Sequence, residues 1–114
     1  MTAVFTLANI GDTQANQLAS ATPFTQSAVA GSVQVSVAGA ASVVLLSSVY
    51  NPGQTVIVVD TAGFAGRPGA PITITISSGG TIDGLANKKI TAPGGSFTLM
   101  FVSGTAWQTV GHNP

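Results

Sequence analysis

Hydrophobic and small polar residues alternate along several short stretches of this chain. Between residues 32 and 38, Val33, Val35 and Val37 are separated by glutamine and serine. Between residues 72 and 76, isoleucine alternates with threonine in the same way. Successive side chains of a strand point to opposite faces of the sheet, so a period of two predicts half-buried strands at both places.

Four further stretches are predicted to be strands. Residues 42–47 and 55–59 are nearly continuous apolar runs, typical of more buried strands, and residues 96–102 and 106–110 form a strand pair. Turn signals separate them at residues 51–53, 79–84 and 103–105. No interval is long enough for a crossover helix, which parallel neighbours usually need. The pattern therefore predicts an all-β fold, built as an antiparallel sandwich or a small barrel.

The first 31 residues differ from the rest of the chain. They are rich in alanine, threonine, glutamine, serine and asparagine, and their few large apolar residues are irregularly spaced. A short helix over residues 13–20 is one interpretation, and Pro23 would end it. We favour an extended arm that orders against a partner. The expected organisation is an N-terminal arm over residues 1–31, for attachment or contact between subunits, and a β-sandwich module over residues 32–114.

Charged residues are rare in this sequence. They make up 5% of the chain and sum to a net charge of zero, whereas about 25% is typical of soluble domains. A net charge near zero favours association over dispersal. This composition favours a protein that works in an assembly.

The same composition disfavours several classes of partner. Nucleic-acid binding needs clustered cations, and Lys88–Lys89 is the one basic pair. No apolar run approaches the roughly 20 residues of a membrane span, and there is no cysteine. We expect neither nucleic acid nor a membrane as a partner.

Few residues suggest reaction chemistry. Asp60 and Asp83 could form a carboxylate pair or bind calcium, but their spacing matches no calcium loop, and each fits better as a turn residue. Asp83 and Gly84 together form a tight-turn pair, and we expect the Asp83 carboxylate to accept backbone N–H groups within residues 80–84. His112 is expected in a mobile tail, and Trp107 in the core or a subunit interface rather than under a sugar. We therefore expect no enzymatic activity, no catalytic or metal site and no cofactor.

Two segments hold candidate interface residues. The glycine-rich loop over residues 61–71 contains Phe64 and Arg67, and these two residue types are enriched in binding hot spots. The alternative is that Phe64 packs back onto its own module. In the predicted arm the candidates are the large apolar residues, namely Val4, Phe5, Leu7 and Phe24.

Three motifs together resemble a known group of modules. They are the strand that ends at Asp60, the turn Thr81-Ile82-Asp83-Gly84, and the late Gly104-Thr105-Ala106-Trp107. Over residues 53–110, about half the chain, the sequence resembles small β modules of tailed-bacteriophage virion proteins, which occur in head fibres, capsid decoration proteins and tail fibres. The resemblance implies a homotrimer without enzymatic activity.

This resemblance, with one module and one arm, leads to an expected function. The chain would be a trimeric capsid decoration (cement) or head-fibre protein that binds the outer shell. Its partners would be copies of itself and the major capsid protein, and it would lie on the capsid surface after synthesis in the host cytoplasm. The alternative is a tail-fibre or baseplate adhesin module that binds a host-surface glycan, which a set of outward aromatic residues would favour.

Overall fold

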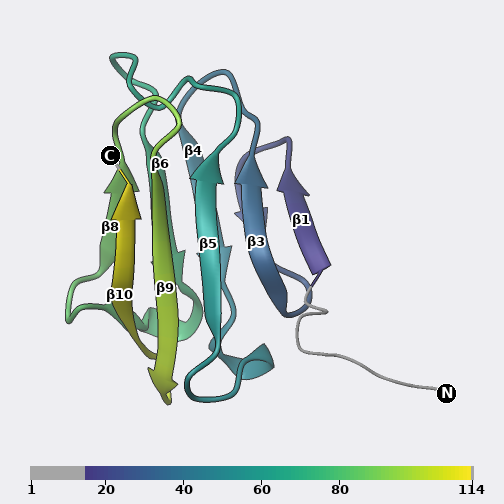
Figure 1. Ribbon diagram of the computed structural model, residues 1–114, viewed down its shortest axis with the longest axis vertical. Helices are drawn as coiled ribbons and strands as arrows, with labels where there is room; N and C mark the ends of the chain where they lie inside the picture. Colours follow the sequence, from purple (N-terminus) through teal and green to yellow (C-terminus); the bar gives the residue numbers. More distant parts are fainter. Residues whose placement is uncertain (1–14, 114) are drawn as a thin grey trace, which may run out of the picture.

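A computed structural model describes residues 15–113, and in that range the chain is built from strands arranged in two sheets (Figure 1). The six-stranded sheet contains, in spatial order, β1 (Ala15–Ala19), β3 (Ala30–Val35), β5 (Thr55–Asp60), β9 (Ser96–Ser103), β10 (Ala106–Asn113) and β7 (Thr81–Ile82). The four-stranded sheet contains β2 (Phe24–Thr25), β4 (Ala41–Leu45), β6 (Ile72–Ile76) and β8 (Asn87–Ile90). Two short 3-10 turns, η2 (Ser47–Val49) and η3 (Ser77–Gly79), follow β4 and β6. The predicted all-β class is confirmed.

The first six strands alternate between the two sheets along the chain. As a result β1, β3 and β5 lie parallel in one sheet, and β2, β4 and β6 lie parallel in the other. The expected antiparallel pairing is wrong for these strands. It assumed that a parallel connection needs a helix, whereas here the connecting element is a strand of the opposite sheet. Antiparallel pairing begins later, where β9 joins β5 and β10, and β8 joins β6.

The predicted N-terminal arm is wrong for residues 15–31, which belong to the two sheets. β1 pairs with β3 along its length, and the proposed boundary between residues 31 and 32 falls inside β3. The side chains of Ala19 and Ala30 are buried. Because these side chains are small, the hydrophobic pattern of this segment is weak. The strand conformation of β1 depends on its pairing with β3. Residues 1–14 lie outside the described part of the chain.

A polar network also ties the segment before residue 32 to the body. Gln26 is buried, its side-chain amide donates to the Tyr50 hydroxyl, and its side-chain oxygen accepts the Leu46 N–H at 3.1 Å. The Tyr50 hydroxyl in turn donates to the Ala30 carbonyl at 3.0 Å. Buried polar groups of this kind are costly when unpaired, so the two segments stabilise each other.

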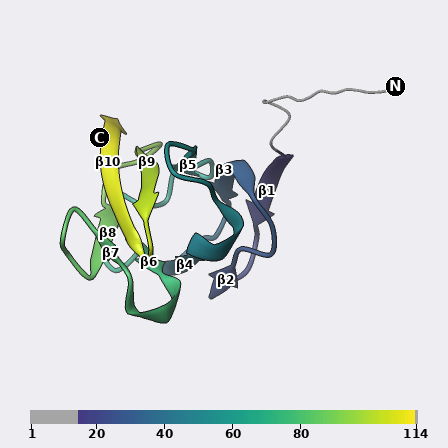
Figure 2. The same cartoon turned by 90° about the horizontal axis from the view of Figure 1, so that it is seen from below.

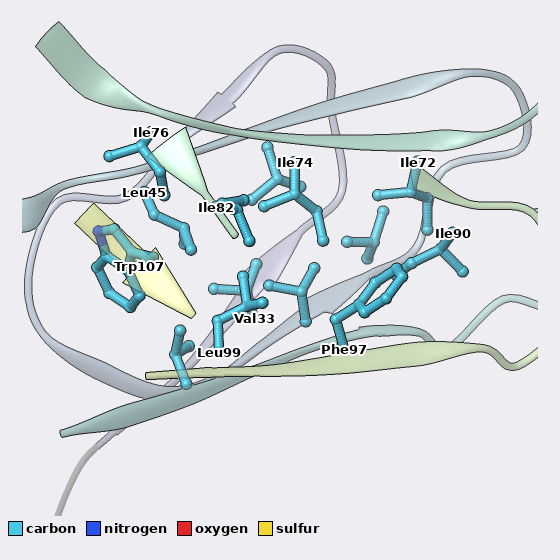
Figure 3. Packing of buried hydrophobic residues seen from close by; sticks show 14 of the residues in the cluster. Val33, Leu45, Ile72, Ile74, Ile76, Ile82, Ile90, Phe97, Leu99 and Trp107 are labelled. Carbon is cyan, nitrogen blue, oxygen red and sulfur yellow. The ribbon is translucent and has the colours of Figure 1, made fainter. Parts of the chain in front are cut away.

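The hydrophobic core lies between the two sheets, which Figure 2 shows as two layers. Ile72, Ile74 and Ile76 point inward from β6 toward Leu99 of β9 and Trp107 of β10 (Figure 3). Trp107 is 2% exposed, and its indole N–H donates to the Ser47 hydroxyl at 2.9 Å. Of the two positions predicted for this tryptophan, the core or a subunit interface, the structure places it in the core.

Candidate assembly surface

The outer face of the six-stranded sheet is formed by the side chains that alternate with its core residues. These outer-face residues are Asn16, Leu18, Ser32, Gln34, Thr55, Ile57, Val59, Ser96, Thr98, Met100, Val102, Gln108 and Val110. None of them is charged. Within residues 15–113 this face is therefore made of aliphatic, thioether, hydroxyl and amide groups only.

Strand register places these side chains in rows across the sheet. Ser32 of β3 lies beside Ile57 of β5, and Ile57 lies beside Thr98 of β9. On the other side of Ser32, its hydroxyl donates to the Asn16 side-chain oxygen at 2.7 Å. Because the neighbours of Ile57 are small, its side chain remains 41% exposed at the middle of the face.

Exposed aliphatic side chains gather on the outer face. Leu18 is 61% exposed, Val102 40% and Val110 52%, in addition to Ile57. Only one other large hydrophobic residue of the described chain, Leu85 in the turn between β7 and β8, is comparably exposed. Several exposed aliphatic side chains on one face of a sheet are typical of a contact surface.

The outer face of the four-stranded sheet has a different character. Thr73 and Thr75 point outward from β6, opposite its buried isoleucines. Thr73 lies beside Lys89 of β8, and Thr75 lies beside Val44 of β4. This second face carries a cation, whereas the outer face of the six-stranded sheet carries none.

The loop over residues 61–71 is anchored by the carboxylate of Asp60, which is 3% exposed. This carboxylate accepts the N–H groups of Gly63 at 3.0 Å, Ala65 at 3.0 Å and Gly94 at 3.1 Å. Burial raises the pKa of Asp60, but these N–H donors together outweigh it and hold the pKa below its ordinary value. The predicted role of Asp60 as a structural turn residue agrees with this geometry.

Phe64 and Arg67 are brought together in the same loop. The Arg67 guanidinium lies 4.2 Å from the centre of the Phe64 ring, and the backbone N–H of Arg67 donates to the backbone carbonyl of Phe64. Phe64 is half-buried and Arg67 is exposed. Contact with another molecule would therefore reach Arg67 more readily than the aromatic ring.

Asp83 lies in a turn, but its carboxylate bonds to a residue outside that turn. Asp83 and Gly84 both have positive φ, 54° and 79°, which suits a tight turn. The carboxylate accepts the hydroxyl and N–H of Thr109 at 2.6 and 2.8 Å and lies 3.1 Å from the Lys88 ammonium. The two Thr109 bonds, followed by Lys88, hold the pKa of Asp83 below its usual value. The expectation of bonds within the turn at residues 80–84 is wrong, because the carboxylate holds strand β10.

The remaining candidate residues of the sequence lie in different parts of the chain. Phe24 is half-buried and packs against the core, so most of it is not available as an interface. His112 lies in β10, and its ring stacks on Phe97 with 4.4 Å between centres, so the prediction of a mobile tail is wrong. Val4, Phe5 and Leu7 lie outside the described residues.

Sequence reasoning missed the outer face of the six-stranded sheet. Leu18, Ile57 and Val110 were not among the candidate interface residues, although each is exposed on this face. A signal was available, because the outward positions of the predicted strands already lacked charge. What the sequence could not supply was the order of strands that makes those positions neighbours.

Among residues 15–113 no group of three or more histidine or acidic side chains is placed to hold a metal ion. No helix in that range is long and apolar enough to cross a membrane. No protein-family model matches the sequence, and no curated protein matches it either.

Proposed function

We propose that this protein is a non-enzymatic structural component of a tailed-bacteriophage virion. It forms a homotrimer and binds the outer capsid shell as a decoration (cement) or head-fibre protein. The observation that carries the proposal is the outer face of the six-stranded sheet, which is uncharged and holds four of the five most exposed large hydrophobic residues in the described chain. The sequence resemblance over residues 53–110 supplies the virion context.

A structural subunit has a physical reason to carry such a surface. Burying a charge at an interface costs several kcal/mol unless it is well paired, whereas hydroxyl and aliphatic groups are buried at little cost when they find partners. A protein with 5% charged residues avoids that cost wherever copies meet. The fold also suits a structural subunit. We infer a sandwich, because residues of both sheets contribute to one core cluster.

Attachment to the shell requires a second surface. Arg67 is exposed in the anchored loop over residues 61–71, and within residues 15–113 no carboxylate lies within ion-pair distance of it. An arginine in this position would pair well with a carboxylate of another protein. We propose Arg67, together with Val4, Phe5 and Leu7, as the contacts with the major capsid protein.

Localisation in the particle tests the proposed function. Immunogold electron microscopy of purified virions whose phage encodes this chain should label the capsid surface. Label confined to the tail would favour the adhesin alternative. Absence of the chain from purified virions would refute a virion role of any kind. For shell binding, Arg67→Glu should reduce decoration of particles, while Lys89→Glu, a matched charge reversal on a strand, should leave it unchanged.

A further inference from the structure

We infer that copies of this chain contact one another through the outer face of the six-stranded sheet, with Ile57 at the centre of the contact. The inference rests on the proposed function for its premise that the protein assembles with itself. It adds the surface that is used and the second copy as its occupant.

The outer face is large enough for a specific contact. Strands β1, β3, β5, β9 and β10 span about 19 Å at ~4.8 Å per neighbouring pair, and an eight-residue strand such as β9 extends about 25 Å. The projected area is therefore about 500 Å² per copy, or about 1,500 Å² over the three faces of a trimer. Each contact between two copies uses about half of each face, and the three contacts together reach the area that specific protein–protein interfaces bury.

The chemistry of the outer face suits contact with an identical face. Identical charged patches repel when symmetry brings them together, but this face has no charged side chain. The outer face of the four-stranded sheet would bring together copies of Lys89. Symmetric contact is therefore favoured through the six-stranded sheet.

The residues of the outer face also supply both parts of a typical contact. Ile57 of β5, Val102 of β9 and Val110 of β10 offer apolar area that water leaves on association. Gln34 of β3 and Thr98 of β9 offer amide and hydroxyl groups that both donate and accept hydrogen bonds, so the two sides of the face can pair with each other. The Asn16–Ser32 hydrogen bond already orders one side of the face.

Other classes of occupant lack the groups that would recognise them. Nucleic acid and anionic lipid surfaces need lysine or arginine, and the outer face has neither. Base and sugar rings stack on aromatic side chains, but Phe97, Phe101 and Trp107 of β9 and β10 all point into the core. A second copy is the occupant that the face fits as it stands.

In a homotrimer, three such faces would surround the three-fold axis. The β1–β3 side of one copy would then meet the β9–β10 side of the next, which is a head-to-tail contact that closes after three copies. Ile57 of β5, between the two sides, would lie nearest the axis. A lysine at that position would bring three positive charges together where the face has no negative charge to pair with them.

Sedimentation of the full chain with substitutions on the two outer faces tests the inference. The native protein should have the mass of three chains at micromolar concentration. Ile57→Lys should lower the association constant by at least about 30-fold, which is the loss expected at a binding hot spot. The matched control Thr75→Lys, at an outward position of a central strand in the other sheet, should leave the mass unchanged. Gln34→Lys replaces a residue that is already polar, and it should also weaken association.

Each outcome decides a separate point, provided that circular dichroism shows the variants folded. If Ile57→Lys and Gln34→Lys both retain the native mass, the inference is overturned, while the proposed virion role stands. A native monomer overturns the inference and the homotrimer, and leaves virion localisation to the microscopy. A native dimer that Ile57→Lys dissociates supports the contact and contradicts only the three-fold symmetry. A mass lost equally in Thr75→Lys overturns the assignment to this face.

Discussion

Replacing Asp60 with asparagine tests whether one carboxylate anchors two loops. The substitution keeps the size of the side chain and removes its charge. In the native protein one carboxylate oxygen accepts the N–H groups of Ala65 and Gly94, and the other accepts the N–H of Gly63. In Asp60→Asn, an amide oxygen replaces one carboxylate oxygen, and an NH₂ group replaces the other and opposes an N–H donor.

The expected loss of stability follows from these three bonds. A hydrogen bond to a charged group contributes about 1.5–3 kcal/mol, and a neutral one about 0.5–1.5 kcal/mol. The bonds from Ala65 and Gly94 would each lose about 1 kcal/mol, and the bond from Gly63 would be lost outright at about 1–2 kcal/mol. Because the Gly63 and Gly94 bonds are only partly buried, water relieves some of the cost. We expect Asp60→Asn to lower the free energy of unfolding by about 2–4 kcal/mol.

Urea unfolding followed by Trp107 fluorescence measures this change, at one fixed chain concentration because association shifts apparent stability. The matched control is Asp83→Asn, which keeps the left-handed turn and loses exposed bonds, at a cost of about 1 kcal/mol. If the two variants lose equal stability, the carboxylate of Asp60 does not anchor the loops.

The pH dependence gives an independent check on Asp60. Its pKa is lower in the folded than in the unfolded chain, so its contribution is present above the unfolded pKa of about 4 and is lost as pH falls through the folded value. The stability difference between the native protein and Asp60→Asn should therefore be full at about pH 7 and should shrink below about pH 4. A difference that stays constant down to about pH 2 would contradict this assignment.

Two further predictions concern the N-terminal strands β1 and β2 and the packing of Gly66 in the loop over residues 61–71. A chain that begins at Ser32 lacks β1, β2 and Gln26, so its unfolding followed by circular dichroism should no longer be cooperative. A stable truncated protein would show that β3 does not need β1 as a neighbour. Gly66→Ala should destabilise by roughly 1–3 kcal/mol, since an added Cβ would lie 2.3 Å from the Pro93 ring, whereas Gly39→Ala, with open space around it, should be neutral or slightly stabilising. Equal melting temperatures for the two glycine variants would contradict the close packing of the loop.

Several strands could be predicted from the sequence because their side chains report burial directly. The stretch that alternates isoleucine and threonine is β6, and the apolar run that ends at Asp60 is β5. In both cases large apolar residues at a spacing of two leave one face that must be covered. The turn residues Asp83 and Gly84 were equally readable, because positive φ favours those residue types.

Strand pairing was decided by the tertiary structure. A period of two is the same in parallel and antiparallel sheets, so the pattern of β3 and β5 did not reveal that they run parallel. β1 and β8 have few large apolar residues and were missed, because their strand conformation depends on hydrogen bonds to neighbours. The partner of Asp83 likewise depends on a residue 26 positions away.

For the candidate surface, too, the sequence and the tertiary structure determined different properties. The sequence by itself determined that outward positions would be uncharged, because it contains so few charged residues to place there. Only the tertiary structure decided that Leu18, Ile57 and Val110, which are far apart in the chain, would lie on one face. Neighbours within a strand are set by covalent geometry, whereas neighbours across a sheet are set by register, and register depends on how the whole core packs.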